Sequence, residues 1–418
     1  MDISPNFLNM NNDILKHEDK PCSDLFAGLH TDYFPYYRSW CHDVPIFIST
    51  QRDQEIRTLQ EILYRCCAFY TEHYMDYLDV IPYEDKVLKI LDHAANFPFR
   101  AGTFRPDYVI REDGSILVCE ITSRFFGNGY FMSYFMEAAG EEFAKEAKVT
   151  DRRSYFEDFF EYMASFARGY SRMFVLKSAD KSDSIKLYVP FYQALGLDVK
   201  VLEADEVEDN IQSMKGGLII SALNQNDLLS YSMDTLKTLA DQGMRNDFRT
   251  VFLLHDKRFF YLFFKDSFTD RFLDAKETLF LRSHVIPTYL YGFDMDRWED
   301  ARKNKDGYII KHHCLGKSEK VYAGSLTDSD KWDEMFEEGQ ISSMILQPFI
   351  KQKIFSAGWQ GSMLHDYLSP SILCVDDRYF GTALFRTSSC PVINQADAHK
   401  VAPVLSDQAY KFPGCHIL

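Results

Sequence analysis

The hydrophobic pattern of the first part of the chain predicts helices. From Gln51 to Leu78, apolar residues recur at helical spacing, which is typical of an amphipathic α-helix. The stretch from Phe131 to Phe166 alternates acidic and aromatic patches and is again helix-rich. Residues 1–95 are therefore expected to form a helical N-terminal region, and further helices are expected within residues 96–168.

After Gly169 the pattern changes to short apolar runs. Residues 172–178 predict a buried strand, the next apolar positions predict a helix that ends at Gly196, and residues 198–204 and 216–223 predict two more strands. Strand, helix and strand in this order indicate a small βαβ layer over residues 169–244. The layer contains no G-x-G-x-x-G sequence, so a dinucleotide site is not expected in it.

Residues 245–418 mix helices with short strands. Four apolar runs predict strands in this part of the chain: GYIIKHH, SMILQPFI, PSILCVDD and RYFGTALFR. The sequence has no repeats, proline-rich linkers or low-complexity runs, so we expect its units to be interleaved rather than tethered.

The charge balance excludes some function classes. The 418 residues carry 46 Lys and Arg against 62 Asp and Glu, a formal charge of −16 without a basic block, which disfavours a nucleic-acid binder. No signal-peptide pattern is present, and no run reaches the ~18 apolar residues of a membrane span. The nine cysteines form no C-x-x-C pair, so we expect reduced thiols rather than a zinc site or disulfides. A cytoplasmic protein without membrane partners is expected.

Two strand-like runs flank Asp113-Gly114, the commonest two-residue signal for a β-hairpin. Counting back from such a loop places Asp107 opposite Glu120 and Arg105 opposite Thr122. These four side chains then share one face of the hairpin, because side chains alternate along a strand. The other face, which can pack on a core, would carry Tyr108, Ile110, Leu117, Cys119 and Ile121.

The paired acids of this hairpin indicate a cation site. Two carboxylates roughly 5 Å apart repel each other by about 3 kcal/mol at an effective dielectric constant near 20. A divalent cation is the simplest compensation, and the oxygens of Asp107, Glu120 and Thr122 suit magnesium held together with nucleotide phosphates. On this view Asp107→Asn would leave folding intact. The alternative is a solvated hairpin in which the acids splay apart or Arg105 bridges them.

Two lysines are candidates for phosphate contacts. Lys257 precedes an aromatic helix, and Lys311 ends an apolar strand whose following loop contains Gly316 and Gly324. A lysine is a point charge suited to phosphate, and a position at the end of a strand fixes it. The alternative for each lysine is a surface residue whose stem lies along apolar neighbours.

Two further strand ends have two interpretations each, and one histidine pair has a single one. Gln347 and Pro348 end a buried strand, either beside an adenine edge or in an ordinary turn. Arg386 ends another strand and suits a phosphoryl group in transfer, or else a surface ion pair. His312 and His313 should face opposite ways on a strand, so we expect no metal site there.

The order of these features resembles the circularly permuted ATP-grasp enzymes, in particular the synthetase domain of glutathionylspermidine synthase. The resemblance spans about Gly102 to Leu405 and rests on the order Arg-x-Asp, hairpin, Glu-x-Thr, βαβ unit, two lysines, glutamine and arginine. It implies an α+β, circularly permuted ATP-grasp fold. The metal-binding hairpin and its helices would occupy residues 96–168, a pre-ATP-grasp-like βαβ unit residues 169–244, and the nucleotide-binding lobes residues 245–418.

The resemblance also implies a reaction and its residues. Such enzymes are ATP-dependent, magnesium-dependent carboxylate–amine ligases, in which a substrate acid is phosphorylated and an amine then displaces phosphate. The substrates would be small acids and amines, such as amino acids, peptides or polyamines. The implied roles are magnesium binding for Asp107, Glu120 and Thr122, catalysis for Arg105 and Arg386, and ATP binding for Lys257, Lys311, Gln347 and Gly316.

The chain departs from this family in three ways. Thr122 stands where the relative has Asn, the loop after Lys311 has only Gly316 near its start, and no amidase domain is recognisable. Glutathionylspermidine synthesis is therefore not implied. Two other functions stay open: an inactive ATP-grasp scaffold that binds a nucleotide or a protein, and a magnesium-dependent phosphodiesterase like the PD…D/ExK nucleases. Residues 125–130 and the N-terminal region would set substrate specificity.

Overall fold

The computed structural model describes residues 21–29, 31, 33–179, 184–316, 318–337, 340–393, 399–411 and 416–418. An antiparallel sheet lies at its centre, with strand order β14-β13-β12-β2-β3 and β11 added along β12. The strands in this order along the chain are β2 (Thr103–Ile110), β3 (Ile116–Thr122), β11 (Phe355–Trp359), β12 (Ser362–Val375), β13 (Arg378–Ser388) and β14 (His399–Val401). The strands predicted from PSILCVDD and RYFGTALFR are confirmed as parts of β12 and β13.

One face of the central sheet packs on α3 (Thr50–His73), the long helix predicted from residues 51–78. Ser49 caps this helix by accepting a hydrogen bond from the Arg52 backbone N–H (3.2 Å), and a 3₁₀ turn (Tyr74–Tyr77) extends it. The residues that share the predicted apolar side are all buried: Ile56, Leu59, Ile62, Leu63, Cys66 and Tyr70. The predicted helix is confirmed.

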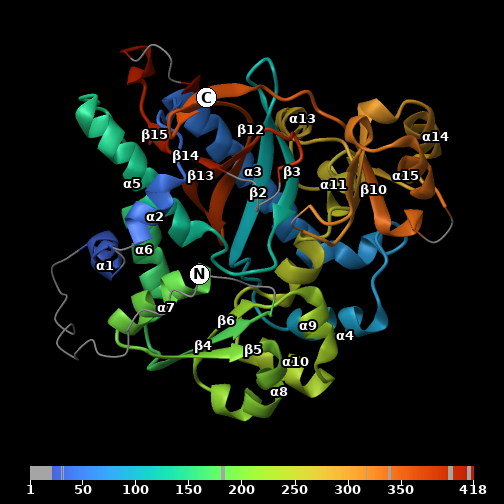
Figure 1. The fold of residues 1–418 in the computed structure, drawn as a ribbon. Helices are drawn as coiled ribbons and strands as arrows, with labels where there is room; N and C mark the ends of the chain where they lie inside the picture. Colours follow the sequence, from blue (N-terminus) through green and yellow to red (C-terminus); the bar gives the residue numbers. More distant parts are fainter. Residues whose placement is uncertain are drawn as a thin grey trace.

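The opposite face of the sheet is covered by aromatic helices, which are grouped at the left of Figure 1. Phe26, Phe131, Phe159, Phe160 and Phe191 form the centre of this second core. The helices are α1 (Cys22–Leu29), α2 (Tyr33–Ser39), α5 (Tyr130–Glu146), α6 (Phe156–Ser165) and α7 (Ser184–Ala194). The helix-rich segment predicted from 131 to 166 is thus confirmed as α5 and α6.

A parallel three-stranded sheet, ordered β5-β4-β6, lies below the central sheet in Figure 1. Its strands are β4 (Arg172–Lys177), β5 (Asp198–Glu203) and β6 (Leu218–Ala222), and α7 connects the first two. The predicted βαβ layer is confirmed. Its surrounding helices are α4 (Asp85–Ala94), α8 (Val207–Asn210), α9 (Gln225–Ser230) and α10 (Met233–Asp241).

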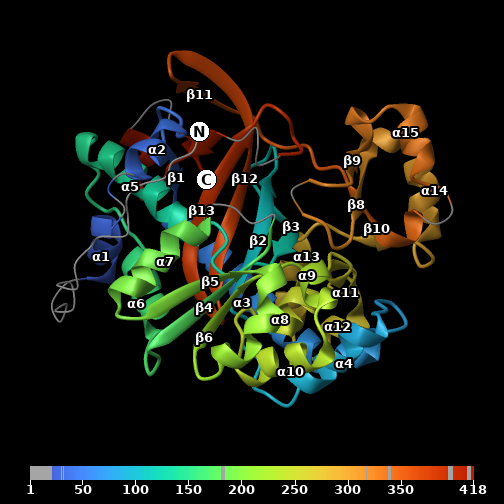
Figure 2. The same ribbon diagram turned by 60° about the horizontal axis from the view of Figure 1, so that its bottom comes forward.

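A second antiparallel sheet, ordered β7-β10-β8-β9, stands beside β3 (Figure 2). One of its faces packs on two helices through Trp298, Ile310, Trp332 and Leu346. We call this the lid unit; it consists of β7 (Tyr289–Leu290), α14 (Met295–Lys303), β8 (Tyr308–His312), β9 (Val321–Ala323), α15 (Ser329–Glu334) and β10 (Met344–Pro348). The strands predicted from GYIIKHH and SMILQPFI are confirmed as β8 and β10.

A third, small sheet joins the two ends of the chain. β1 (Ile46–Ile48) lies between β15 (Pro403–Leu405) and β16 (His416–Ile417), parallel to both. The region expected to be helical therefore also contributes a strand. Between the parallel sheet and the lid unit run a π-helical segment (Thr250–Leu254), α11 (Phe259–Leu262), α12 (Asp266–Thr269) and α13 (Ala275–His284). In the described part of the chain, no helix is long and apolar enough to cross a membrane.

Candidate functional site

The hairpin of β2 and β3 pairs Asp107 with Glu120 and Arg105 with Thr122, as predicted. The loop that produces this register differs from the predicted two-residue loop. The Arg111 N–H bonds to the Ser115 carbonyl (2.8 Å), so the loop has three residues, with Gly114 at φ +84°. A β-bulge between the Asp107 and Tyr108 pairings then restores the register that a two-residue loop would have given.

The bulge also changes which residues of β3 face the core. Ile116, Val118 and Ile121 belong to the main hydrophobic core, whereas Leu117 and Cys119 do not. The predicted core positions of Leu117 and Cys119 were therefore wrong, because the extra residue at Cys119 reverses the alternation. The same shift turns Glu120 towards the polar face, beside Asp107.

Asn246 holds this hairpin to the rest of the molecule. Its buried amide accepts a hydrogen bond from the Thr103 N–H (2.8 Å) and donates to the carbonyls of Thr103 (2.9 Å) and Ser123 (2.8 Å). One side chain thus fixes the start of β2 and the end of β3. Gly102, at φ +64°, leaves room for it, since a Cβ there would overlap the amide oxygen.

Asp107 is almost completely buried, with 1% of its surface exposed. Its Oδ1 accepts from Arg105 Nε (2.9 Å) and Ser371 Oγ (2.6 Å). Its Oδ2 accepts from Arg105 Nη2 (3.0 Å), Arg386 Nη2 (3.1 Å) and, at 3.4 Å, Thr122 Oγ1. Two guanidinium groups therefore compensate this carboxylate. This differs from the alternative considered above, a solvated hairpin in which Arg105 bridges the two acids, because Asp107 is buried and Arg386 binds it as well.

These contacts decide how well the predicted magnesium ligands fit. A carboxylate offers about four lone pairs, and Asp107 already accepts five hydrogen bonds. Thr122 is turned towards the same carboxylate. With these contacts in place, Asp107, Glu120 and Thr122 do not fit a magnesium ion. Magnesium binding by these three residues stays a prediction, and it requires that Arg105 or Arg386 first release Asp107.

Glu120 is the more open acid of the pair, with 27% of its side chain exposed. Its Oε2 lies 3.4 Å from Lys257 Nζ. Burial raises the pKa of Glu120, but the cations around it, Lys257, Lys311, Arg386 and Arg105, outweigh burial and lower that pKa below its usual value. Cations from four separate segments of the chain thus converge on one carboxylate.

Lys257 and Lys311 are both buried, with exposures of 2% and 8%. Lys257 Nζ donates to the Leu315 carbonyl (2.6 Å), which ties it to the loop that follows β8. Lys311 lies in β8 opposite Ile345, on the lid-unit face that does not pack on α14 and α15. Among the described residues no acid lies within ion-pair distance of Lys311.

Gln347 and Gly316 lie on the lid-unit side of this cluster. Gln347 is fully buried in β10 and donates from Nε2 to Thr288 Oγ1 (2.9 Å), while its Oε1 has no partner among the described residues. Gly316 approaches Arg124 so closely that a Cβ would lie 2.5 Å from Nη2. Seven of the predicted residues, with Asp107 and Glu120 among them, thus form one charged cluster, whereas Gln347 and Gly316 make no hydrogen bond to either acid in the described part of the chain.

The sequence did not indicate two other residues of the site. Ser371 lies directly opposite Asp107 because β12 pairs with β2 across more than half of the chain. Lys400 lies opposite Arg386 in β14, where burial and then Arg386 lower its pKa to about 8. No local pattern marks either residue, since both positions depend on long-range strand pairing.

A cluster of Asp256, His313 and Cys314 lies next to Lys257. Cys314 Sγ is 2.8 Å and Asp256 Oδ2 3.1 Å from the same nitrogen, His313 Nδ1. The rings of His312 and His313 stack at 4.9 Å, which corrects the expectation that they face opposite ways. Arg258 binds Asp256 through two nitrogens, and burial raises the pKa of the Cys314 thiol, so neither a cation nor a thiolate is favoured there.

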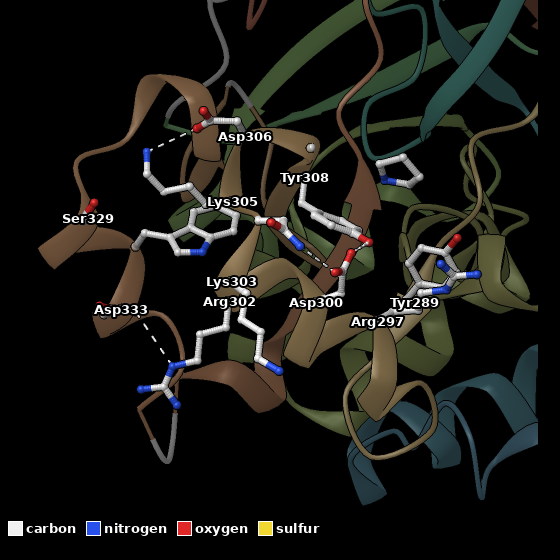
Figure 3. Close-up of a pocket in the computed structure, with 14 residues that line it drawn as sticks. Tyr289, Arg297, Asp300, Arg302, Lys303, Lys305, Asp306, Tyr308, Ser329 and Asp333 are labelled. Atoms are coloured by element: carbon white, nitrogen blue, oxygen red, sulfur yellow. Dashed lines mark hydrogen bonds and ion pairs between the residues drawn. The ribbon is translucent and has the colours of Figure 1, made fainter.

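A cavity of about 860 Å³ lies on the lid unit, lined by α14, α15 and the turn before β8 (Figure 3). Several of its charged groups already have partners in the lining: Asp300 accepts from Tyr308 (2.6 Å), Lys305 lies 3.4 Å from Asp306, and Arg302 lies 3.8 Å from Asp333. None of the predicted site residues lines it. The candidate site is the charged cluster, not this cavity.

Comparison with solved structures shows a likeness in fold at low sequence identity. The chain is similar to the solved apo structure of a glutathione synthetase-like effector from Globodera pallida, with a TM-score of 0.57, 10% identity and coverage of 93% of this chain and 98% of that one. The two chains therefore share an overall fold. A family model described as the AnkG N-terminal domain matches residues 59–253, which include the hairpin and the parallel sheet. Among curated proteins, none matches.

Proposed function

We propose that the protein is an ATP-dependent carboxylate–amine ligase of the circularly permuted ATP-grasp class. The observation that carries the proposal is the convergence of Arg105, Lys257, Lys311 and Arg386 on Glu120, beside the second antiparallel sheet. Four cations around one partly exposed carboxylate favour a triphosphate over an uncharged ligand. The likeness to a glutathione synthetase-like fold supports the same chemistry.

In this proposal the lysines bind phosphate. Lys257 and Lys311 come from two sides of the cluster and are already dehydrated, so little solvation is lost when a phosphate binds them. Gln347 is placed on the lid unit with an unpartnered Oε1, which can accept a hydrogen bond from the amino group of adenine. The loop at Gly316, tied to Lys257 through Leu315, would close over the phosphates.

Arg105 and Arg386 would act at the group in transfer. Positive charge fixed beside the equatorial oxygens of a phosphoryl group stabilises the charge that develops during its transfer. Arg105 also donates from Nη1 to the Asn128 carbonyl (3.0 Å), which connects the cluster to the loop at residues 125–130. That loop is a reasonable boundary of the pocket for the substrate acid, with the acid lying between it and the γ-phosphate.

A nucleotide-binding scaffold without turnover is the second candidate. It is favoured by Asp107, whose lone pairs are all engaged by Arg105, Arg386, Ser371 and Thr122. The site does not support the phosphodiesterase alternative, because that chemistry requires both Asp107 and Glu120 to be free to bind a metal ion. The two remaining candidates differ in whether ATP is consumed.

The decisive experiment measures ADP release from ATP and magnesium in the presence of pooled amino acids, peptides and polyamines. A ligase forms ADP when the acid is phosphorylated, and it continues to release ADP over many turnovers only when an amine is present to displace phosphate from the acyl phosphate. The Glu120→Gln variant should lose turnover. It should keep its fold, because the Glu120 side chain is partly exposed. If ATP raises the melting temperature but no acid–amine pair stimulates ADP release, the scaffold holds; if ATP changes neither, both proposals fail.

A further inference from the structure

A second chemical centre lies away from the charged cluster, at the far edge of the central sheet. His42 follows α2, Asp366 lies in β12 and His399 begins β14. Their donor atoms all lie within 4.8 Å of one another. We propose that these three residues form a binding site for a divalent transition metal of the zinc class. The proposal does not depend on the ligase function.

The donor types select the metal. Two imidazoles and one carboxylate are the ligands of zinc, cobalt(II) and iron(II) sites, whereas magnesium and calcium prefer oxygen ligands alone. Three protein ligands also leave a position free for water or a substrate, as in catalytic rather than structural zinc sites. The His399 side chain is 26% exposed, so this position can be reached from solvent.

The distances fit a tetrahedral ion. In a tetrahedron with bonds of about 2.1 Å the ligand atoms lie about 3.4 Å apart, and His42 Nε2 lies 3.4 Å from Asp366 Oδ2. His399 Nδ1 lies 3.8 Å from the same oxygen, so a small rotation of this more exposed ring completes the geometry. Two of the three distances between ligand atoms thus lie near the tetrahedral value, and the third is within 4.8 Å.

The charge of Asp366 supports a cation. This carboxylate is 2% exposed, and its contacts are Thr387 Oγ1 (2.7 Å) and the two imidazoles. No lysine or arginine of the described residues lies within ion-pair distance of it. Asp366 is thus stabilised by one hydroxyl group and two imidazoles, and a bound cation would supply the positive charge that no Lys or Arg of the described residues provides.

The backbone around the three residues is well fixed. The His42 N–H donates to the Lys400 carbonyl (2.8 Å), and the Lys400 N–H donates to the Trp40 carbonyl (2.8 Å). These bonds hold the turn after α2 against β14. Trp359 covers His399, with ring centroids 4.2 Å apart. A bound metal would therefore meet ligands whose main chain is already ordered.

One of the three proposed ligands, His42, lacks a hydrogen bond at its second ring nitrogen in the described part of the chain, and this limits the affinity of the site for a metal ion. His42 Nδ1 has no hydrogen-bond partner among the described residues, whereas metal-binding histidines usually donate from their second nitrogen. We therefore expect binding weaker than in structural zinc sites. The cluster at Asp256 differs in another respect, because Arg258 already occupies its carboxylate.

Cobalt(II) titration of the metal-free protein tests the proposal. Nitrogen and oxygen ligands in a tetrahedral site give strong visible absorption without the near-ultraviolet band of a thiolate ligand. We expect such a spectrum with saturation at one ion per chain, displacement by zinc, and its loss in His399→Ala. His399 is the ligand to change first because it is the most exposed of the three. His365→Ala is the matched control, since this exposed histidine adjoins Asp366 on the same strand.

Several outcomes would overturn the proposal. A spectrum with a thiolate band would place the ion at a cysteine instead. Equal cobalt binding by wild type and His399→Ala, or equal loss in His399→Ala and His365→Ala, would exclude this site. A second variant, Asp366→Asn, must also lose the band while circular dichroism shows it to be folded; retention of the band in a folded Asp366→Asn protein contradicts the assignment.

Discussion

Arg105 binds Asp107 through two parallel hydrogen bonds, Nε to Oδ1 at 2.9 Å and Nη2 to Oδ2 at 3.0 Å. The two residues are two positions apart on β2, so both side chains lie on the same face and the pair forms within one strand. The acid predicted to need a metal ion is compensated by its own neighbour.

The first prediction concerns Asp107→Asn. The substitution removes the charge that faces the buried guanidinium of Arg105 and the partly buried guanidinium of Arg386, so we expect a loss of about 3 to 5 kcal/mol in the free energy of unfolding. Urea denaturation followed by tryptophan fluorescence measures it. This is the opposite of the intact folding expected from mutual repulsion of Asp107 and Glu120.

Glu112→Gln is the control for this experiment. Glu112 is exposed in the turn of the same hairpin, and its loss should change stability by less than about 0.5 kcal/mol. If Asp107→Asn unfolds at the same urea concentration as wild type, the ion pair contributes nothing, and the metal set gains support.

The second prediction separates binding from stability at Lys311. This lysine is buried without an ion pair in the described part of the chain, so Lys311→Met should leave the unfolding free energy equal or raise it by about 1 kcal/mol. The same change should abolish the rise in melting temperature caused by ATP, because a phosphate contact is lost. Differential scanning fluorimetry with and without ATP measures both effects.

Lys305→Met in the same unit is the matched comparison. Lys305 Nζ donates to the carbonyls of Gly324 (2.6 Å) and Thr327 (2.8 Å), so its loss should cost about 1.5 to 3 kcal/mol. A Lys311→Met protein that is strongly destabilised would show a structural lysine instead of a ligand-binding one.

The third prediction is a pH dependence at Glu137. Burial raises the pKa of Glu137 to about 7, above its value of about 4.3 in the unfolded chain. Between these values the folded protein binds more protons than the unfolded one, so this residue makes stability fall as pH rises from 4 to 7. The loss at pH 8 is about 4 kcal/mol at 1.36 kcal/mol per pKa unit.

Glu137→Gln should remove this dependence. Relative to wild type, the variant gains stability as pH is raised from 4 to 8, measured by urea denaturation at each pH. Glu146→Gln, at the exposed end of α5, is the control and should follow wild type. A constant difference between Glu137→Gln and wild type across this range would show that Glu137 titrates normally, and the Arg152 contact (3.2 Å) would then dominate.

The fourth prediction concerns the packing of the lid unit. A Cβ on Gly324 would overlap the Lys305 carbonyl oxygen, and the backbone there has little freedom to move. We expect Gly324→Ala to cost about 2 kcal/mol or more in the free energy of unfolding, measured by urea denaturation. Gly307→Ala is the control, because a Cβ on Gly307 would have no neighbour within 4 Å. Equal stability of the two variants would contradict the close approach.

The hairpin shows how far the sequence could lead. The pairing of Asp107 with Glu120 was predicted correctly, although the loop is one residue longer and a bulge compensates for it. Local turn chemistry explains the loop, but the bulge follows from burial: Ile116, Val118 and Ile121 all reach the core only if one residue is inserted. Burial is a property of the whole fold and was not visible in the hairpin alone.

The long-range partners could not be predicted for the same reason. Ser371, His42 and Asp366 acquire their roles from strands and turns that meet only in the folded chain. The lysines and arginines were proposed from their residue types, their positions in the sequence and the family resemblance, and their roles stay predictions. What the sequence could not reveal is that two of these cations already engage Asp107.

The small sheet of β1, β15 and β16 has a consequence for how the protein is made. β1 is synthesised early, yet both of its neighbouring strands come from residues 403–417. During translation the backbone N–H and C=O groups of β1 have no strand partner until residues 403–417 have left the ribosome. Chaperone binding near residues 46–48 would protect this exposed apolar strand, and cleavage after β14 would leave it open to pairing with other chains.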